Sequence, residues 1–155
     1  MIEIKPPASI RVTNFPKIFL GGSIEMGLAD DWQNKVKDAL VDRDVILFNP
    51  RRDNWDSSWA QRANNPVFAE QVTWELDALE SADIVIFYFD PATKSPITLL
   101  ELGLSAEKIN LIVCCPDGFW RKGNVEIVCN RFDIKMVNTF DELIDSLHHL
   151  LNQHK

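Results

Sequence analysis

The side chain most suited to chemistry is Glu101, in the segment Ser-Pro-Ile-Thr-Leu-Leu-Glu-Leu-Gly at residues 95–103. A helix is predicted there, and helical spacing places Glu101 in the sector of three aliphatic residues: Ile97, Leu100 and Leu104. A carboxyl group in an apolar sector is partly desolvated, which raises its pKa. The alternative is an ordinary amphipathic helix with Glu101 at the margin of its apolar stripe, and spacing alone favours this alternative.

A second carboxyl group, that of Glu75, belongs to the preceding predicted helix. The apolar stripe of this helix is predicted to consist of Phe68, Val72, Leu76 and Leu79. Helical spacing puts Glu75 at the edge of this stripe and turns Asp77 to solvent. Helix surfaces carry many acids, so a solvated Glu75 is the ordinary alternative. If both carboxyls instead reach one cleft about 5 Å apart, they suit glycosidic cleavage with retention of configuration through a covalent sugar–enzyme intermediate.

Two further segments could contact a ligand. The turn containing Gly22 and Ser23 could present backbone N–H groups and a hydroxyl, although it matches neither the Walker pattern nor G-x-G-x-x-G and is equally typical of a plain turn. The loop over residues 51–64 carries Arg51, Trp55 and Asp56 among other polar and aromatic residues. Its aromatic rings could stack on a planar base, or the loop could be a packed surface segment or a subunit contact.

The elements that must position these residues are punctuated by Gly, Pro and Asn. Apolar runs predict five strands, at residues 17–20, 45–48, 84–89, 111–115 and 135–137. Helices are predicted at about residues 30–40, 65–81, 97–108 and 141–151, two of them started by Asn65-Pro66 and Ser95-Pro96. The alternation predicts a single α/β domain over residues 1–155 with a doubly wound parallel five-stranded sheet, a three-layer αβα arrangement of flavodoxin-like or Rossmann-like type. Ligands bind such sheets at the carboxyl ends of the strands.

Composition excludes several classes of protein. The formal net charge of −7 argues against a nucleic-acid partner, because Lys and Arg supply most of that affinity. No apolar run reaches the ~20 residues of a bilayer-spanning helix. The three cysteines lack metal-ligand spacing, and the three histidines lie near the C-terminus without acidic or Cys partners at such spacing. A signal peptide needs an apolar stretch, but the N-terminal segment carries Lys5, Pro6 and Pro7, so we expect a cytoplasmic protein. We also expect that the protein uses no metal or organic cofactor.

Taken together, these segments resemble the nucleoside 2-deoxyribosyltransferase-like family over about residues 17–124. The resemblance rests on Ile-Phe-Leu-Gly-Gly-Ser-Ile at 18–24, on Trp-Glu at 74–75 with Ser-Ala-Asp-Ile-Val at 81–85, and on Glu-Leu-Gly at 101–103. The last is the most specific, since the family nucleophile is the glutamate of such a triplet, with a polar residue six positions earlier. A branch that carries Ser-Pro-Ile-Thr-Leu-Leu-Glu-Leu-Gly and Phe-Trp-Arg-Lys-Gly-Asn-Val is the most similar.

The resemblance implies a role for each matching residue. Glu101 would attack the anomeric carbon, and Glu75, eight residues before Asp83, would transfer a proton to the leaving base. Ser95 would hold a sugar hydroxyl, while Gly22 and Ser23 would line the sugar or its 5′ substituent. Family members take one more polar side chain from a neighbouring subunit. Here that residue would be Asn124, which implies a homodimer or a larger homo-oligomer.

Three positions depart from the family pattern. Phe19 stands in the substrate pocket where many members have a Tyr that orients the nucleophile, and a phenyl ring cannot do so. Glu25 stands where members that act on 5′-monophosphates have Arg, which predicts a nucleoside or another uncharged 5′ end. Glu75 replaces the usual Asp and extends the acid by about 1.5 Å.

Three functions therefore stay open. The first is transfer of a deoxyribosyl group between bases through a glutamyl–sugar ester. The second is hydrolysis of the same bond, with water in place of the incoming base. The third is a non-catalytic nucleotide- or metabolite-binding module, because a fold does not determine a function.

Overall fold

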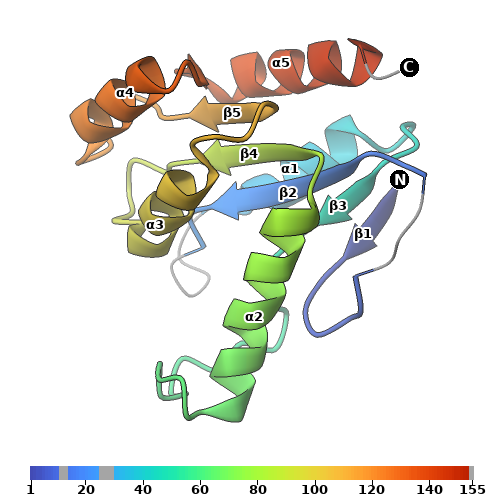
Figure 1. Cartoon of the computed structure of the whole chain (residues 1–155), viewed down its shortest axis with the longest axis vertical. Coiled ribbons are helices and arrows are strands. Elements are labelled where there is room, and N and C mark those ends of the chain that lie inside the picture. The colour runs from blue at the N-terminus through green and yellow to red at the C-terminus, as the bar shows by residue number, and fades with distance from the viewer. Residues whose placement is uncertain (11–13, 25–29, 154–155) are drawn as a thin grey trace.

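A computed structural model describes residues 1–10, 14–24 and 30–153 and shows one sheet with helices on both faces (Figure 1). Within these residues the sheet has six parallel strands in the order β1-β3-β2-β4-β5-β6. They are β1 (Ile2–Ile4), β2 (Lys17–Gly22), β3 (Ile46–Phe48), β4 (Ile84–Tyr88), β5 (Leu111–Cys114) and β6 (Lys135–Val137). The predicted three-layer parallel fold is confirmed.

The predicted strand count of five is corrected to six. Strand β1 has only three residues and follows no turn signal, so its sequence does not stand out. It is held at the edge of the sheet by pairing with β3, with Ile2 opposite Ile46. The carboxylate of Glu3 adds to this pairing, because it accepts hydrogen bonds from Lys37 and Asn49.

Five helices occur in the described part of the chain, one more than predicted. Helices α1 (Trp32–Ala39) and α5 (Phe140–Gln153) cover one face of the sheet, and α2 (Pro66–Ser81), α3 (Pro96–Ser105) and α4 (Lys122–Arg131) cover the other (Figure 1). The additional helix is α4, which buries only Val125 and Cys129 and so has little amphipathic signal. None of the helices described is long and apolar enough to cross a membrane.

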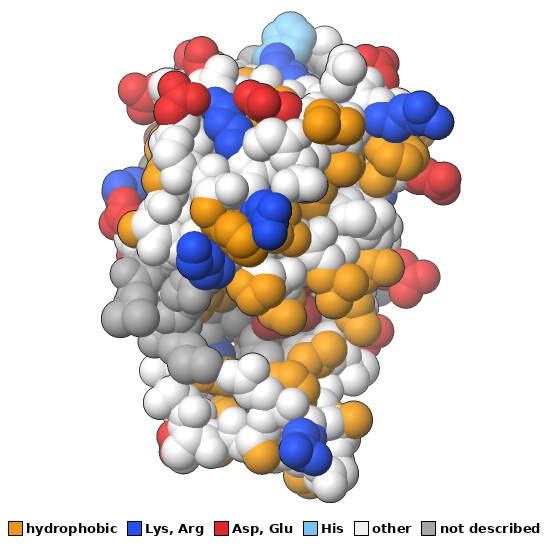
Figure 2. Space-filling view, turned by 90° about the vertical axis from the view of Figure 1, so that its left-hand side faces the viewer, with side chains coloured by type: hydrophobic (Ala, Val, Ile, Leu, Met, Phe, Trp, Pro, Cys, Tyr) orange, Lys and Arg blue, Asp and Glu red, His pale blue; other side chains and the backbone are white. Residues whose placement is uncertain are grey.

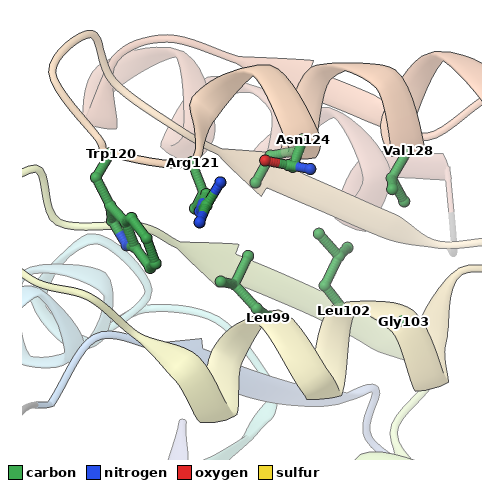
Figure 3. Close-up of a pocket in the computed structure, with 8 residues that line it drawn as sticks. Leu99, Leu102, Gly103, Trp120, Arg121, Asn124 and Val128 are labelled. Carbon is green, nitrogen blue, oxygen red and sulfur yellow. The ribbon is translucent and has the colours of Figure 1, made fainter.

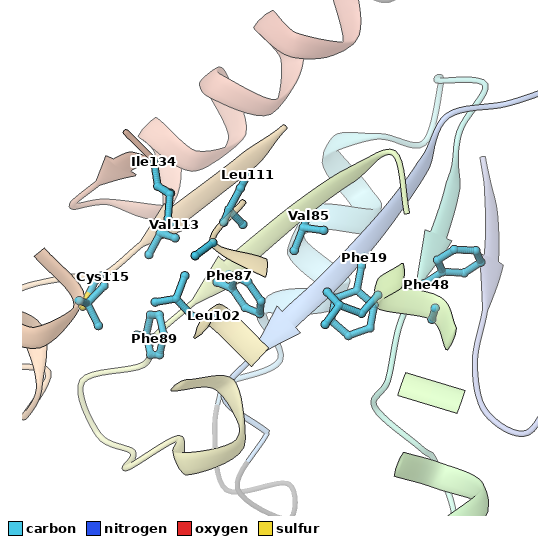
Figure 4. Packing of buried hydrophobic residues seen from close by; sticks show 14 of the residues in the cluster. Phe19, Phe48, Val85, Phe87, Phe89, Leu102, Leu111, Val113, Cys115 and Ile134 are labelled. Carbon is cyan, nitrogen blue, oxygen red and sulfur yellow. The ribbon is translucent and has the colours of Figure 1, made fainter. Parts of the chain in front are cut away.

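Alternating side chains of the buried strands build a separate apolar layer on each face. Under α2, α3 and α4 the layer includes Phe19, Phe48, Val85, Phe87 and Phe89 (Figure 4). Under α1 and α5 it consists of the intervening residues, among them Ile18, Leu20, Ile84 and Ile86. This period of two along fully buried strands is what a parallel sheet covered on both faces requires.

The order of the strands determines where a ligand crevice forms. Strands β3 and β1 lie on one side of β2, and after β3 the chain crosses to the other side to form β4, β5 and β6. The strand order therefore reverses between β2 and β4, and the crevice of such sheets opens at the carboxyl ends of the two strands. Gly22 at the end of β2 lies opposite Tyr88 at the end of β4, so the segments that follow them begin side by side.

Candidate active site

A cavity of about 720 Å³ opens at the carboxyl ends of β2 and β4. Its walls come from the turn after β2, the loop after β3, helix α2 and helix α3. The molecule is visibly hollowed on this side, and hydrophobic side chains gather along the margin of the hollow (Figure 2). Of the residues that the sequence singles out, seven line the cavity: Glu101, Glu75, Gly22, Ser23, Ser95, Arg51 and Trp55.

Glu101 lies on the inward face of α3 and is 8% exposed. Burial raises the pKa of its carboxyl to about 8, and the nearby charge of Glu75 contributes to the same direction. The residues buried beside it on this face of α3 are Thr98, Leu102 and Ser105. Glu101 is therefore partly desolvated, although helical spacing alone favours the alternative at the margin of an apolar stripe.

The aliphatic residues of α3 are arranged differently from the prediction. Ile97, Leu100 and Leu104 are about 60% exposed and line the outer part of the cavity. The side chains that the helix buries are instead those of Thr98, Glu101, Leu102 and Ser105. The apolar stripe of α3 is therefore a cavity wall and is not part of the core.

Helix α2 shows the same reversal. Its buried residues are Gln71, Trp74, Ala78 and Leu79, whereas Leu76 is exposed and forms the cavity wall with Phe68 and Val72. The predicted core stripe is thus wrong except at Leu79. Trp74 replaces it, packing edge-on against Phe48 with ring centroids 6.3 Å apart and donating its indole N–H to the Ala8 carbonyl at 2.8 Å.

The Glu75 side chain extends from α2 into the same cavity. Its Oε1 accepts a hydrogen bond of 2.6 Å from the amide nitrogen of Gln71. Burial raises the pKa of Glu75, and the hydrogen bond from Gln71 opposes that rise. Among the residues that the structure describes, no Lys or Arg forms an ion pair with either glutamate. Because the charge of Glu75 adds to the effect of burial in raising the pKa of Glu101, ionisation of one carboxyl disfavours ionisation of the other.

Three hydroxyl groups meet where the segments after β2 and β4 come together. Thr93 donates to Ser23 at 2.8 Å and lies 2.8 Å from the hydroxyl of Ser95, which is in turn in close contact with Ser23. The backbone N–H of Asp90 also donates to Ser23, at 2.9 Å. All three hydroxyl residues are buried. The cluster joins the two segments at the inner end of the cavity.

Ser95 precedes α3, as predicted, but its side chain does not cap the helix. Its φ of 49° lies in the left-handed region, which is uncommon for a residue other than Gly. In this conformation its hydroxyl joins Ser23 and Thr93. Thr93 was not predicted as a site residue, and its position just after the carboxyl end of β4 is the signal that could have identified it.

Gly22 allows β2 and β4 to approach closely at the cavity. A β-carbon at this position would lie 2.5 Å from the Tyr88 carbonyl oxygen and 2.7 Å from the Trp32 ring. Both distances are shorter than van der Waals contact, so no larger residue fits without moving the backbone of β4.

Arg51 and Trp55 form the side of the cavity that comes from the loop after β3. Arg51 is half-buried, and the contacts of its guanidinium group with described residues are long: 3.4 Å to Gln33, 3.5 Å to the Asp30 carbonyl and 3.8 Å to Asp31. Trp55 packs edge-on against Trp59, with ring centroids 5.3 Å apart. The loop therefore presents an aromatic ring and a guanidinium group to a ligand.

Two of the predicted substrate contacts are not cavity residues. Phe19 is fully buried in the layer under α2 and α3 because the alternation along β2 turns it into the core (Figure 4). Asp56 is exposed on the outer side of its loop, where its carboxylate accepts the backbone N–H of Ser58 at 2.9 Å. Neither residue lines the cavity that contains the glutamates.

Asn124 lies outside this cavity as well. It is exposed on α4 and lines a separate hollow of about 350 Å³ between α3 and α4, together with Leu99, Leu102 and Trp120 (Figure 3). A single chain therefore does not bring Asn124 to the glutamates. Glu25, which bears on the predicted 5′ end of the substrate, is outside the described residues. Across the described ranges, no three His, Cys, Asp or Glu side chains are grouped to hold a metal ion.

Comparisons with known proteins agree with the fold and supply a family. No curated protein sequence matches the chain. Among solved structures, a conserved protein from Enterococcus faecalis V583 is similar, with a TM-score of 0.59 and 14% sequence identity over 91% of this chain and 99% of that one. This likeness shows the fold alone. The sequence profile described as "Nucleoside 2-deoxyribosyltransferase like" matches residues 15–119, a range that contains both glutamates and all the residues that line the cavity. The chain therefore belongs to the nucleoside 2-deoxyribosyltransferase-like family.

Proposed function

We propose that the protein cleaves the N-glycosidic bond of a 2′-deoxynucleoside and transfers the deoxyribosyl group to another base. The observation that carries this proposal is that the buried carboxyl of Glu101 and the partly buried carboxyl of Glu75, on neighbouring helices, line one cavity, and neither forms an ion pair within the described ranges. Family membership supports the same chemistry. No metal or organic cofactor is needed, because the ring oxygen of the sugar stabilises positive charge at the anomeric carbon.

In the first half of the reaction, the ionised carboxylate of Glu101 attacks the anomeric carbon. The carbon–nitrogen bond breaks, its electron pair leaves with the base, and Glu75 donates a proton to the base nitrogen. In the second half, the incoming base loses its proton to Glu75, attacks the same carbon, and releases Glu101 from the ester. Each complete cycle returns both carboxyls to their starting protonation states.

Because burial and the charge of Glu75 raise the pKa of Glu101 to about 8, Glu101 is the carboxyl that keeps a proton in the ligand-free site. Burial raises the pKa of both carboxyls, so the doubly ionised pair is disfavoured near neutral pH. The reaction requires the microstate with the proton on Glu75 and the charge on Glu101. A developing positive charge on the sugar stabilises that microstate, since it lies next to the carboxylate that attacks it.

The rest of the cavity suits a sugar and a base. Ser23 and Ser95, which line the cavity and both contact Thr93, offer hydrogen bonds to sugar hydroxyls. Trp55 offers a ring face to the base. We further propose that the substrate has an uncharged 5′ end, because Glu25 would repel a phosphate group. We also propose a homo-oligomer in which Asn124 of one subunit completes the cavity of its neighbour.

The deciding experiment is incubation of the protein with deoxynucleosides, with and without a second free base. A new nucleoside in the presence of the second base supports transfer. Free deoxyribose alone, with or without that base, identifies hydrolysis by the same carboxyls. Glu101→Gln should abolish turnover, whereas Glu107→Gln, on an exposed residue just beyond α3, should retain it.

A non-catalytic binding module gives a different result. Wild-type protein would then bind nucleosides without releasing base or sugar, and Glu101→Ala would bind them with unchanged affinity. That outcome over a panel of purine and pyrimidine deoxynucleosides would overturn the proposal.

A further inference from the structure

Gln71 contacts the proposed acid directly and lies on α2, four residues before Glu75. It is 4% exposed and its amide nitrogen donates two hydrogen bonds. One goes to Oε1 of Glu75 at 2.6 Å and the other to the carbonyl oxygen of Pro50 at 3.0 Å. An amide NH₂ group has two hydrogens, so its donor capacity is fully used.

The Pro50 carbonyl determines which way the amide points. If the Gln71 amide rotated by 180°, its oxygen would face the Pro50 oxygen, and two acceptors would meet in a buried place. A backbone carbonyl cannot donate, so this holds whatever the protonation state of Glu75. The amide therefore keeps N–H groups toward both partners.

This orientation has a cost that is visible in the structure. The Gln71 oxygen is buried and has no hydrogen-bond partner among the residues described. An unpaired buried carbonyl oxygen is destabilising, and such atoms are rare in folded proteins. The two bonds of the nitrogen thus outweigh the loss at the oxygen, which marks the contact with Glu75 as one that the fold maintains.

We infer that Gln71 is a positioning residue that determines which oxygen of Glu75 carries the proton: Oε1 always faces an N–H group, so the proton resides on Oε2. This inference rests on the proposed function for its catalytic meaning. Oε2 would give its proton to the nitrogen of the leaving base as the glycosidic bond breaks. The same oxygen would take a proton back from the incoming base.

The inference also connects the acid to the ligand-binding loop. Pro50 directly precedes Arg51 and stands a few residues before Trp55, both of which line the cavity. Through Gln71, the carboxyl of Glu75 is fixed relative to the start of this loop. The amide thus keeps the proton-bearing oxygen in a constant position relative to a base held by the loop.

The kinetic test is a double-mutant cycle with Gln71→Met and Glu75→Gln. Gln71→Met keeps the length of the side chain but removes both N–H donors. We expect kcat to fall by about tenfold or more, a fraction of the 10²–10⁴-fold that general acid catalysis supplies, with KM within about twofold. In the Glu75→Gln background the same change should cost less than about twofold, because no proton remains to be positioned.

Two kinetic results would overturn the inference. Gln71→Met with wild-type kcat would show that the amide is dispensable. An equal loss with and without Glu75 would show that Gln71 acts on the substrate itself. Thr73→Met, on the exposed face of the same helix, is the matched control and should behave as wild type.

A second readout does not require turnover. The Glu75 carboxyl is followed by ¹³C NMR during a pH titration, with its signal assigned by its loss in Glu75→Gln. Because the Gln71 hydrogen bond lowers the pKa of Glu75, Gln71→Met should raise it, and Thr73→Met should not. An unchanged titration in a folded Gln71→Met protein overturns the inference. A raised pKa in a protein that proves to have no transferase activity would leave the Gln71–Glu75 contact established and the proposed function refuted.

Discussion

Replacing Glu101 with Gln should stabilise the folded protein at neutral and alkaline pH. The carboxyl has an ordinary pKa of 4.5 and a pKa of about 8 in the fold, so the folded chain binds more protons than the unfolded chain between these values. Stability therefore falls as the pH rises from 4.5 to 8 and is constant beyond. At ~1.4 kcal/mol per pH unit, the raised pKa of Glu101 lowers the free energy of unfolding by about 5 kcal/mol at pH 9 and by about 3 kcal/mol at pH 7.

The assay is urea denaturation at several pH values between 5 and 9, which gives the free energy of unfolding at each. Wild-type protein should lose stability across this range, and Glu101→Gln should remove most of the loss. Glu107→Gln is the control, because that side chain is exposed beyond the end of α3. If Glu101→Gln and wild type lose stability in parallel, then Glu101 is not held in a desolvated state and the reasoning about its pKa is refuted.

Three other outcomes follow from the site. The rate of transfer should decline as the pH rises through about 8, where the pair of glutamates becomes doubly ionised; a rate that stays constant from pH 6 to 10 would contradict a proton-sharing pair. Gly22→Ala should lower the free energy of unfolding in urea by about 2 kcal/mol or more, because its methyl group meets the Tyr88 carbonyl, whereas Gly123→Ala, with open space around it, should not destabilise. Trp55→Ala should raise KM about five- to tenfold with a smaller change in kcat, as expected if about 1 kcal/mol of stacking on the base is lost; an unchanged KM in steady-state kinetics would remove Trp55 from the binding site.

The sequence predicts the parallel sheet well because its buried strands are continuous apolar runs separated by strong turn signals. It does not predict β1, which has three residues and depends on pairing with β3 rather than on its own pattern. It also misses α4, where only Val125 and Cys129 are buried and no apolar stripe forms. Elements that depend on tertiary contacts leave little periodicity to detect.

The candidate site was predictable in part and for a similar reason. Glu101 and Glu75 stand out from spacing and family resemblance, and both line the cavity. The faces of α2 and α3 were misassigned because aliphatic residues that line a cavity have the same spacing as those that line a core. Gln71 and Thr93 were missed because a polar residue shows its partners only when the chain is folded.

The triangle of hydroxyls made by Ser23, Thr93 and Ser95 has a consequence for recognition. Each hydroxyl carries one hydrogen, and the cluster has acceptors for these hydrogens within the protein, including the Asp90 carbonyl, which accepts from Thr93 at 2.9 Å. A third group that approaches the cluster therefore meets oxygen lone pairs, whichever way the hydrogens are arranged. This wall of the cavity would accept hydrogen bonds from the hydroxyl groups of a ligand and would discriminate against an ether oxygen, which has no hydrogen to donate.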